Sequence, residues 1–168
     1  MAAEKETTSR KLLKKEFDSL LIPLGFRRSF STWIRNNEET TFGVNIERWP
    51  LFEAYYINFW IWIAPDVQSQ RNNPPDLAIR PEDFFEGDAR GQCLLRCDFE
   101  MYTATDEDQA KEIANYVSEL GLPWFEKHRD AAGIKAAWVD NNGRLTRWLS
   151  PGGFQKVRKL VDPTFRGA

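Results

Sequence analysis

A run of ten residues about a third of the way along the chain, from Ala54 to Ile63, is built almost entirely from aromatic and β-branched side chains. This composition is typical of a β-strand packed inside a sheet. Side chains alternate across a strand with a period of two, so every second residue lies on the same face. One face of this run carries Ile57, Phe59, Ile61 and Ile63, and the other carries Tyr56, Asn58, Trp60 and Trp62. The chain therefore needs a sheet with one apolar face and one mixed face.

Three further segments are predicted to be strands, at about 29–35, 41–49 and 93–102, with a turn at Asn36-Asn37 after the first. The same alternation sorts their residues onto the two faces. The apolar face gains Phe30, Thr32, Ile34, Phe42, Val44, Ile46, Leu95, Cys97, Phe99 and Met101.

Two amphipathic helices are predicted to cover that apolar face. The first runs from about Ser9 to Ile22, capped by Thr8 or Ser9 and stopped by Pro23 and Gly25. Its apolar stripe consists of Leu12, Leu13, Phe17, Leu20 and Leu21. The second runs from Asp106 to Leu120, capped by Thr105, and we expect it to end at Gly121 and Pro123. These elements predict an α+β fold, an antiparallel sheet of four to five strands with helices packed on one face.

The chain has 168 residues, which suits a single domain. We expect a core over 8–130, a long proline-containing loop insert over 64–92 with a short helix near 82–85, and a C-terminal extension over 131–168. The alanine-rich run after Ala131 favours a helix ending near Asn142, although Asn142-Gly143 is also a hairpin signal. A last short helix is expected over 154–161.

The second face of the sheet is the candidate binding surface, because large amphipathic rings among charged groups resemble the composition of binding hot spots. Its members are Trp33, Arg35, Asn45, Glu47, Tyr56, Asn58, Trp60, Trp62, Arg96, Asp98 and Glu100. Alternatively, the tail could fold over this face with Trp138, Trp148 and Phe154, or a dimer could form through it.

Catalytic chemistry has little support in the sequence, and no catalytic residue, metal or cofactor is assigned. Glu47, Asp98 and Glu100 could hold a divalent cation if their strands were neighbours, but Arg96 and Arg35 could equally neutralise them. His128 is the only histidine, which excludes sites that need two. Cys93 and Cys97 would lie about 13 Å apart on one strand, too far for a disulfide.

The charge balance argues against a polyanionic partner. There are 23 Lys and Arg against 25 Asp and Glu, giving a net charge of −2. Such a chain has no global attraction for nucleic acid or acidic lipid. Arg27, Arg28 and Arg35 lie near aromatic residues, as in single-strand binders, but the patch is small. A polar N-terminal segment, two cysteines and the absence of a long apolar run lead us to expect a soluble cytoplasmic protein.

Several segments together resemble a known family. They are Leu24-Gly25-Phe26-Arg27-Arg28, the strand residues Phe30 and Trp33 with Val44-Asn45-Ile46, the strand Tyr56-Ile57-Asn58-Phe59, and Gly121-Leu122-Pro123-Trp124-Phe125. Over about residues 10–130 the chain resembles the bacterial domain-of-unknown-function family 4304. The resemblance implies a small α+β domain with an antiparallel sheet, and it carries no established activity and no catalytic residues. The insert and the tail are longer than that family implies.

The functional expectation is a non-enzymatic binding or interaction module of unknown ligand, whose partner could be another protein or a second copy of the chain. A concrete form is a bacterial immunity-type protein that caps a toxin. The alternatives are a metal-assisted hydrolase that uses the carboxylates of the second face, and a homodimeric structural module.

Overall fold

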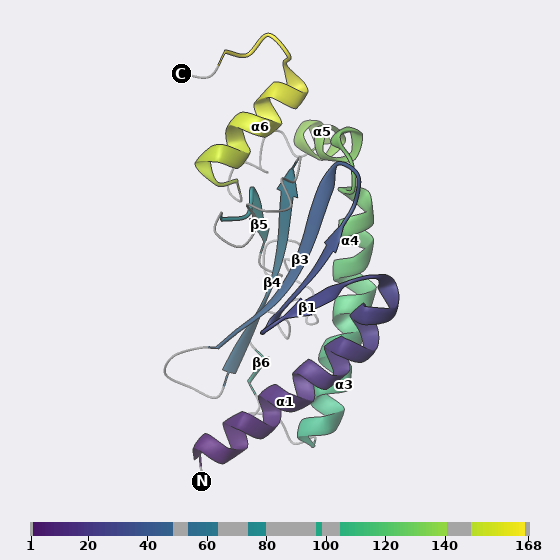
Figure 1. Ribbon diagram of the computed structural model, residues 1–168, viewed down its shortest axis with the longest axis vertical. Helices are drawn as coiled ribbons and strands as arrows, with labels where there is room; N and C mark the ends of the chain where they lie inside the picture. The colour runs from purple at the N-terminus through teal and green to yellow at the C-terminus, as the bar shows by residue number, and fades with distance from the viewer. Residues whose placement is uncertain are drawn as a thin grey trace.

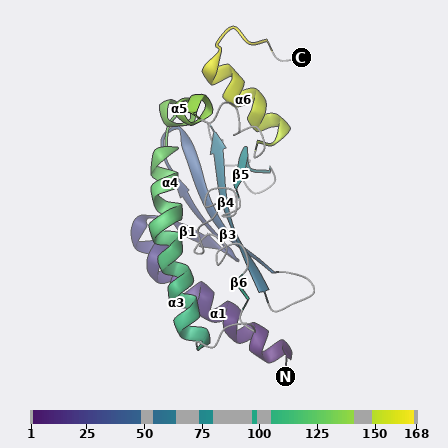
Figure 2. The ribbon, with the colours of Figure 1, turned by 180° about the vertical axis from the view of Figure 1, so that it is seen from behind.

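The computed structural model describes residues 2–48, 54–63, 74–79, 97–98, 105–140 and 149–166. It confirms the predicted α+β fold, since one antiparallel sheet is combined with several helices (Figure 1). The strands follow the order β1-β2-β3-β4-β5, and β6 also pairs with β4. In both ribbon views α1, α3 and α4 lie along one side of the sheet (Figures 1 and 2).

The two long central strands agree closely with the sequence prediction. They are β3, Thr40–Arg48, and β4, Ala54–Ile63, and they pair along their whole length from Thr40↔Ile63 to Arg48↔Tyr55. The strand expected over 93–102 is described only at β6, Cys97–Asp98, which pairs with the start of β4. The predicted loop insert contains a short strand, β5, Leu77–Ile79, which pairs with Phe59, Trp60 and Ile61 of β4. The helix expected at 82–85 lies outside the described residues.

The prediction of a single strand over 29–35 was wrong, because the chain turns within this segment. The structure has β1, Arg27–Ser29, and β2, Thr32–Asn36, joined by a two-residue turn at Phe30 and Ser31. Phe30 has a φ of 56° and is 90% exposed, so it belongs to the turn and not to the core.

The first helix, α1, runs over Ala2–Leu21 and continues into a short 3₁₀ turn, η1, Ile22–Leu24. It begins before the predicted start, so Ser9 lies inside it and does not cap it. The buried Ser9 hydroxyl instead donates a hydrogen bond to Asp106 Oδ2 at 3.1 Å. The predicted stop is confirmed at Gly25, whose φ of 85° is the left-handed conformation that glycine adopts without steric cost.

The second helical segment starts as predicted but does not end where expected. In α3, Asp106–Tyr116, the Thr105 side chain accepts a hydrogen bond from the backbone N–H of Asp108. The chain then continues through a π-helical turn, η3, Val117–Gly121, directly into α4, Leu122–Lys127. Gly121 does not terminate the helix. It lets the helix approach the sheet, because a Cβ at this position would lie 2.5 Å from the Phe59 ring.

The described residues of the C-terminal extension form two helices, α5, Ala131–Asp140, and α6, Pro151–Val161. The helix predicted after Ala131 is therefore confirmed. Both helices lie near the end of β4 in Figures 1 and 2. Lys156 of α6 donates to the backbone oxygen of Ile63 at 3.1 Å and to Asp76 Oδ2 at 2.7 Å, which attaches α6 to this end of the sheet.

The apolar core lies between the sheet and the helices. It is built from alternate residues of β3 and β4 and from the buried stripes of α1 and of the α3–α4 segment. Its fully buried members include Leu13, Phe17, Leu21, Phe42, Val44, Ile57, Phe59, Ile61, Ile113, Val117 and Phe125. The helix stripes and the central strand faces were predicted correctly, which leaves the other sides of β3 and β4 as the open face.

Candidate functional site

The open face is the side of the sheet opposite the α1, α3 and α4 helices. Directly paired residues of antiparallel strands lie on the same face. Asn45 of β3 pairs with Thr32 of β2 and with Asn58 of β4, and Glu47 pairs with Tyr56. The next rows are Ile34, Gly43, Trp60 and Ala78, followed by Asn36, Thr41 and Trp62. The face is thus polar toward one end and aromatic toward the other.

A chain of side-chain hydrogen bonds links the strands at the polar end. Asn45 Nδ2 donates to Thr32 Oγ1 at 2.9 Å and to the backbone oxygen of Ser31 at 3.3 Å. Asn58 Nδ2 donates to Asn45 Oδ1 at 3.4 Å and to Glu47 Oε2 at 3.2 Å. Connected polar networks of this kind hold their side chains in fixed orientations.

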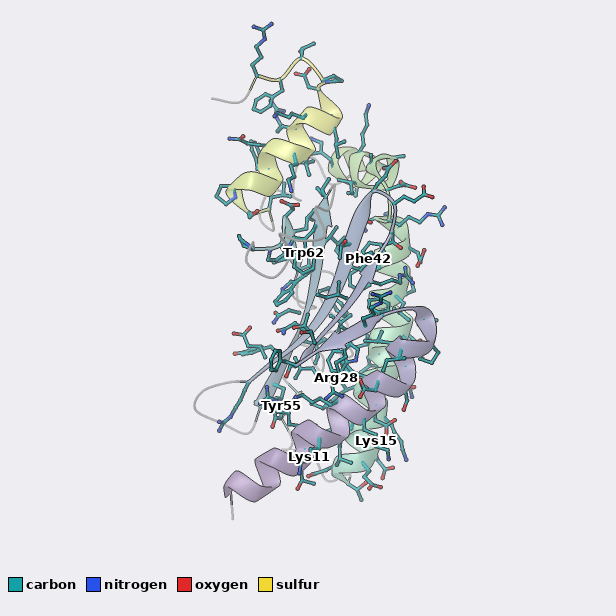
Figure 3. The ribbon with its side chains drawn as sticks, in the orientation of Figure 1. Lys11, Lys15, Arg28, Phe42, Tyr55 and Trp62 are labelled. Atoms are coloured by element: carbon teal, nitrogen blue, oxygen red, sulfur yellow. The ribbon has the colours of Figure 1, made fainter. Side chains whose placement is uncertain are left out.

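The aromatic end is organised by two tryptophans and a glycine. The Trp60 and Trp62 rings meet edge to face, with centroids 5.8 Å apart and an interplanar angle of 84°. Gly43 makes room for them, because a Cβ on this residue would lie 2.9 Å from the Trp62 ring. Figure 3 labels Trp62 near the end of β4.

The open face is less exposed than a bare sheet surface would be. Trp62 and Asn58 are each only 6% exposed. Asn45, Tyr56 and Trp60 are half-buried, and Glu47 is exposed. Of the predicted binding residues, these four are described on the open face and accessible to a ligand, and we call them the open-face site.

Two of the predicted binding residues lie on the opposite side of the sheet. Trp33 is fully buried against the helices, where its ring packs 5.2 Å from that of Phe17. The Arg35 guanidinium lies 5.1 Å from the centroids of both Phe26 and Phe42, and it pairs with Glu126 of α4. Placing Trp33 and Arg35 on the open face was therefore wrong.

The physical reason is the turn at Phe30 and Ser31. The prediction began the alternation at Phe30 and so placed Thr32 and Ile34 in the core. Because Phe30 lies in the turn, it does not determine which face of β2 is buried. The largest apolar side chain of β2, Trp33, is buried on the helix side instead. Its burial on the helix side leaves Thr32 and Ile34 on the open face.

Of the three carboxylates proposed for a metal site, only Glu47 has a described side chain. Glu47 accepts a hydrogen bond from Asn58, and the backbone of Asp98 pairs with that of Ala54. Arg96 and Glu100 lie outside the described residues. Among the residues that are described, no group of three or more His, Cys, Asp or Glu side chains could hold a metal ion.

The structure also contains a polar pocket of about 460 Å³ that sequence reasoning missed. Two distant segments line it, namely Asn37, Glu38 and Glu39 from the β2–β3 turn, and Arg129 and Asp130 before α5. Glu39 Oε2 accepts from the backbone N–H of Ala131 at 2.6 Å, and Asp130 Oδ1 accepts from that of Gly133 at 2.8 Å. These two carboxylates satisfy N–H groups at the start of α5, so this part of the pocket has a structural role.

His128 is buried at the end of α4. Its Nδ1 lies 2.7 Å from the backbone oxygen of Trp124, and the centroids of the His128 and Trp124 rings are 4.5 Å apart. Because a carbonyl oxygen only accepts, Nδ1 carries the proton. Burial lowers the pKa of the imidazole, partly offset by this hydrogen bond. The residue therefore ends the helix as a buried, neutral side chain.

Comparisons with known proteins identify one family. A family model described as Domain of unknown function (DUF4304) matches residues 17–127. No curated protein and no solved structure matches this chain significantly. In the described part of the chain, no helix is both long and apolar enough to cross a membrane.

Proposed function

This chain belongs to the DUF4304 domain family, and from its open-face site we propose that it is a non-enzymatic binding module for a protein partner. The observation that carries the proposal is the group of half-buried or exposed side chains on the open face of β3 and β4. Asn45, Glu47, Tyr56 and Trp60 combine two aromatic rings with an amide and a carboxylate.

The chemistry of this set suits protein recognition. Partly exposed Trp and Tyr side chains supply large apolar contact area and retain a polar group, which is why they are enriched in binding hot spots. The adjacent hydrogen bonds from Asn45 to Thr32 and from Asn58 to Glu47 hold the polar members in place before a partner arrives. Preorganised side chains lose less conformational entropy on binding.

A more specific form of the proposal is a bacterial immunity-type protein of the cytoplasm that caps a toxin. The small α+β fold and the net charge of −2 are compatible with that role by analogy. The low cysteine content supports a reducing compartment.

The proposal is tested by site-specific photocrosslinking in the native host. A photoreactive phenylalanine analogue replaces Trp60, and the covalent products are identified by mass spectrometry. We expect an adduct with one particular protein, and we expect Glu47→Lys in the same chain to weaken it, since the substitution reverses a charge at the edge of the site.

The matched control carries the same analogue at Phe154 of α6, which is 36% exposed and is not one of the open-face site residues. The adduct should not form there. Equal crosslinking from both positions, or none from position 60, would contradict the proposal. A crosslinked product of two copies of this chain would mean that the open-face site mediates self-association and does not bind a different protein.

A further inference from the structure

A second surface, on the helix side, concentrates positive charge. Residues 8–29 contain six basic and two acidic side chains, although the whole chain carries a net charge of −2. Five of the basic residues, together with Phe30, form what we call the α1–β1 basic surface. They are Arg10, Lys11, Lys14 and Lys15 of α1 and Arg28 of β1.

Helical spacing arranges the four α1 side chains in two adjacent rows. Arg10 and Lys14 are one turn apart, as are Lys11 and Lys15. Lys11 and Lys15 are exposed. Figure 3 shows both on α1, with Arg28 beside the same helix.

The charges on this surface repel one another. The pKa of Lys14 is lowered by partial burial and then by the neighbouring charges of Arg10 and Arg28, while Asp18 acts in the opposite direction. Asp18 accepts a hydrogen bond from Arg28 and is its ion-pair partner. One carboxylate among five cations leaves positive charge that an anionic ligand would neutralise.

Two of these cations hold an unusual aromatic residue in place. Arg28 Nε donates to the backbone oxygen of Phe30 at 3.2 Å, and Arg10 donates to Ser31 Oγ at 2.9 Å. Between these contacts the Phe30 side chain is 90% exposed and its φ is 56°. A bulky residue in the left-handed region is strained, and an isolated exposed ring gains nothing from the fold.

We propose that the α1–β1 basic surface binds an acidic segment of a partner protein, with Phe30 inserting into an apolar position of that segment. The cations supply charge complementarity and orientation, and the ring supplies the buried anchor. This surface is separate from the open-face site, so either proposal can fail without the other.

A protein segment fits better than a nucleic acid because the positive area is bounded. The acidic start of α3 lies beside α1, where Asp106 accepts a hydrogen bond from Ser9. The next two residues of α3 are Glu107 and Asp108. A nucleic-acid strand requires a positive groove that continues along its backbone, and these carboxylates interrupt it.

The test is a titration of the full chain with three fluorescently labelled probes at low salt. The first is a short glutamate-rich peptide with one central leucine, the second replaces that leucine by serine, and the third is an oligo-dT strand of the same length. We expect the leucine peptide to bind with the highest affinity and to be released by added salt. Phe30→Ser should lower the affinity for the leucine peptide by about tenfold and leave the affinity for the serine peptide nearly unchanged.

The charge test is a double substitution, Lys11→Glu with Lys15→Glu, which should lower the affinity for both peptides by about tenfold or more. The matched control, Lys135→Glu with Lys159→Glu on α5 and α6, changes the net charge equally and should leave both affinities unchanged. The proposal is overturned if the leucine peptide does not bind, if the control weakens binding as much, or if oligo-dT binds more tightly than the peptides in a Phe30-dependent way.

Discussion

The indole N–H of Trp33 donates a hydrogen bond to Asp18 Oδ1 at 2.9 Å, and this contact joins β2 to α1. Trp33 is fully buried, so its N–H depends on a protein acceptor. We expect Asp18→Ala to lower the free energy of unfolding by about 1–3 kcal/mol, since it leaves that donor unsatisfied. Urea denaturation with an unchanged m-value measures this effect.

A double-mutant cycle separates this hydrogen bond from the Asp18–Arg28 ion pair. In a Trp33→Phe background the cost of Asp18→Ala should fall, because the donor is already absent. Lys15→Ala, an exposed change on the same helix, is the control and should have little effect. If the cost of Asp18→Ala is the same in both backgrounds, the contact does not carry the stability assigned to it.

The same tryptophan shows what the sequence could and could not predict. The alternation over β3 and β4 was correct because long central strands offer many apolar residues that agree on one register. The segment over 29–35 was misassigned because Phe30 looks like a core residue in sequence. Only the fold shows that it sits in a turn, and that β1 is a separate strand.

The α3–α4 segment shows a second limit. Gly121 followed by Pro123 is a strong signal for a helix end, yet the helix passes through both. Pro is tolerated there because it lies in the first turn of α4, and Gly is required there by Phe59. The strand β5 and the pocket at the β2–β3 turn were missed for a similar reason, since both depend on contacts between distant segments.

Gly121→Ala should therefore destabilise the protein even though alanine favours a helix. The added methyl group would lie 2.5 and 2.6 Å from two atoms of the Phe59 ring. Overpacking of this kind costs about 1–3 kcal/mol, which exceeds the gain in helix propensity of about 1 kcal/mol.

The matched control is Gly152→Ala in the first turn of α6, where a Cβ would meet nothing within 4 Å. That change should be neutral or stabilising. Phe59→Leu should reduce the cost of Gly121→Ala, because the smaller side chain relieves the clash. Equal melting temperatures for the two glycine variants would contradict this account.

Burial of His128 predicts a loss of stability in mild acid. The pKa of the folded-state imidazole lies below its ordinary value of 6.5, so the unfolded state binds the proton more readily. The stability contributed by the neutral side chain is complete above about pH 6.5 and declines as the pH falls toward the folded-state pKa.

The measurement is the difference in unfolding free energy between wild type and His128→Gln across this pH range. The difference should shrink, or change sign, as the solution becomes more acidic. The chain has one histidine, so its ring protons also report the folded-state pKa directly by NMR. A measured value above 6.5 would contradict the burial argument.

The attachment of α6 depends mainly on Asp76. Its side chain is 7% exposed, and Oδ2 accepts from the backbone N–H of Ile63 at 2.7 Å and from Lys156 Nζ at 2.7 Å. Asp76→Ala should cost about 1–3 kcal/mol because it leaves the buried N–H unsatisfied. Lys156→Ala should cost less than about 1 kcal/mol, since that side chain is 46% exposed.

Hydrogen exchange distinguishes these two variants. Asp76→Ala should accelerate exchange of the Ile63 amide, whereas Lys156→Ala should leave most of its protection. The reverse order would mean that the lysine, rather than the buried carboxylate, holds this end of the sheet together.

The strain at Phe30 predicts that a substitution on the α1–β1 basic surface can stabilise the protein. Asparagine adopts the left-handed conformation more readily than phenylalanine, whose φ here is 56°. Because the ring is 90% exposed, its removal forfeits almost no burial. We expect Phe30→Asn to raise the free energy of unfolding by up to about 1 kcal/mol.

The matched control is the same change at Phe154. It should be neutral or destabilising, because that residue lies in a right-handed helix and asparagine does not favour a helix over phenylalanine. If Phe30→Asn destabilises the protein, the ring makes a contact that supports the fold, and its exposure would no longer point to a binding role.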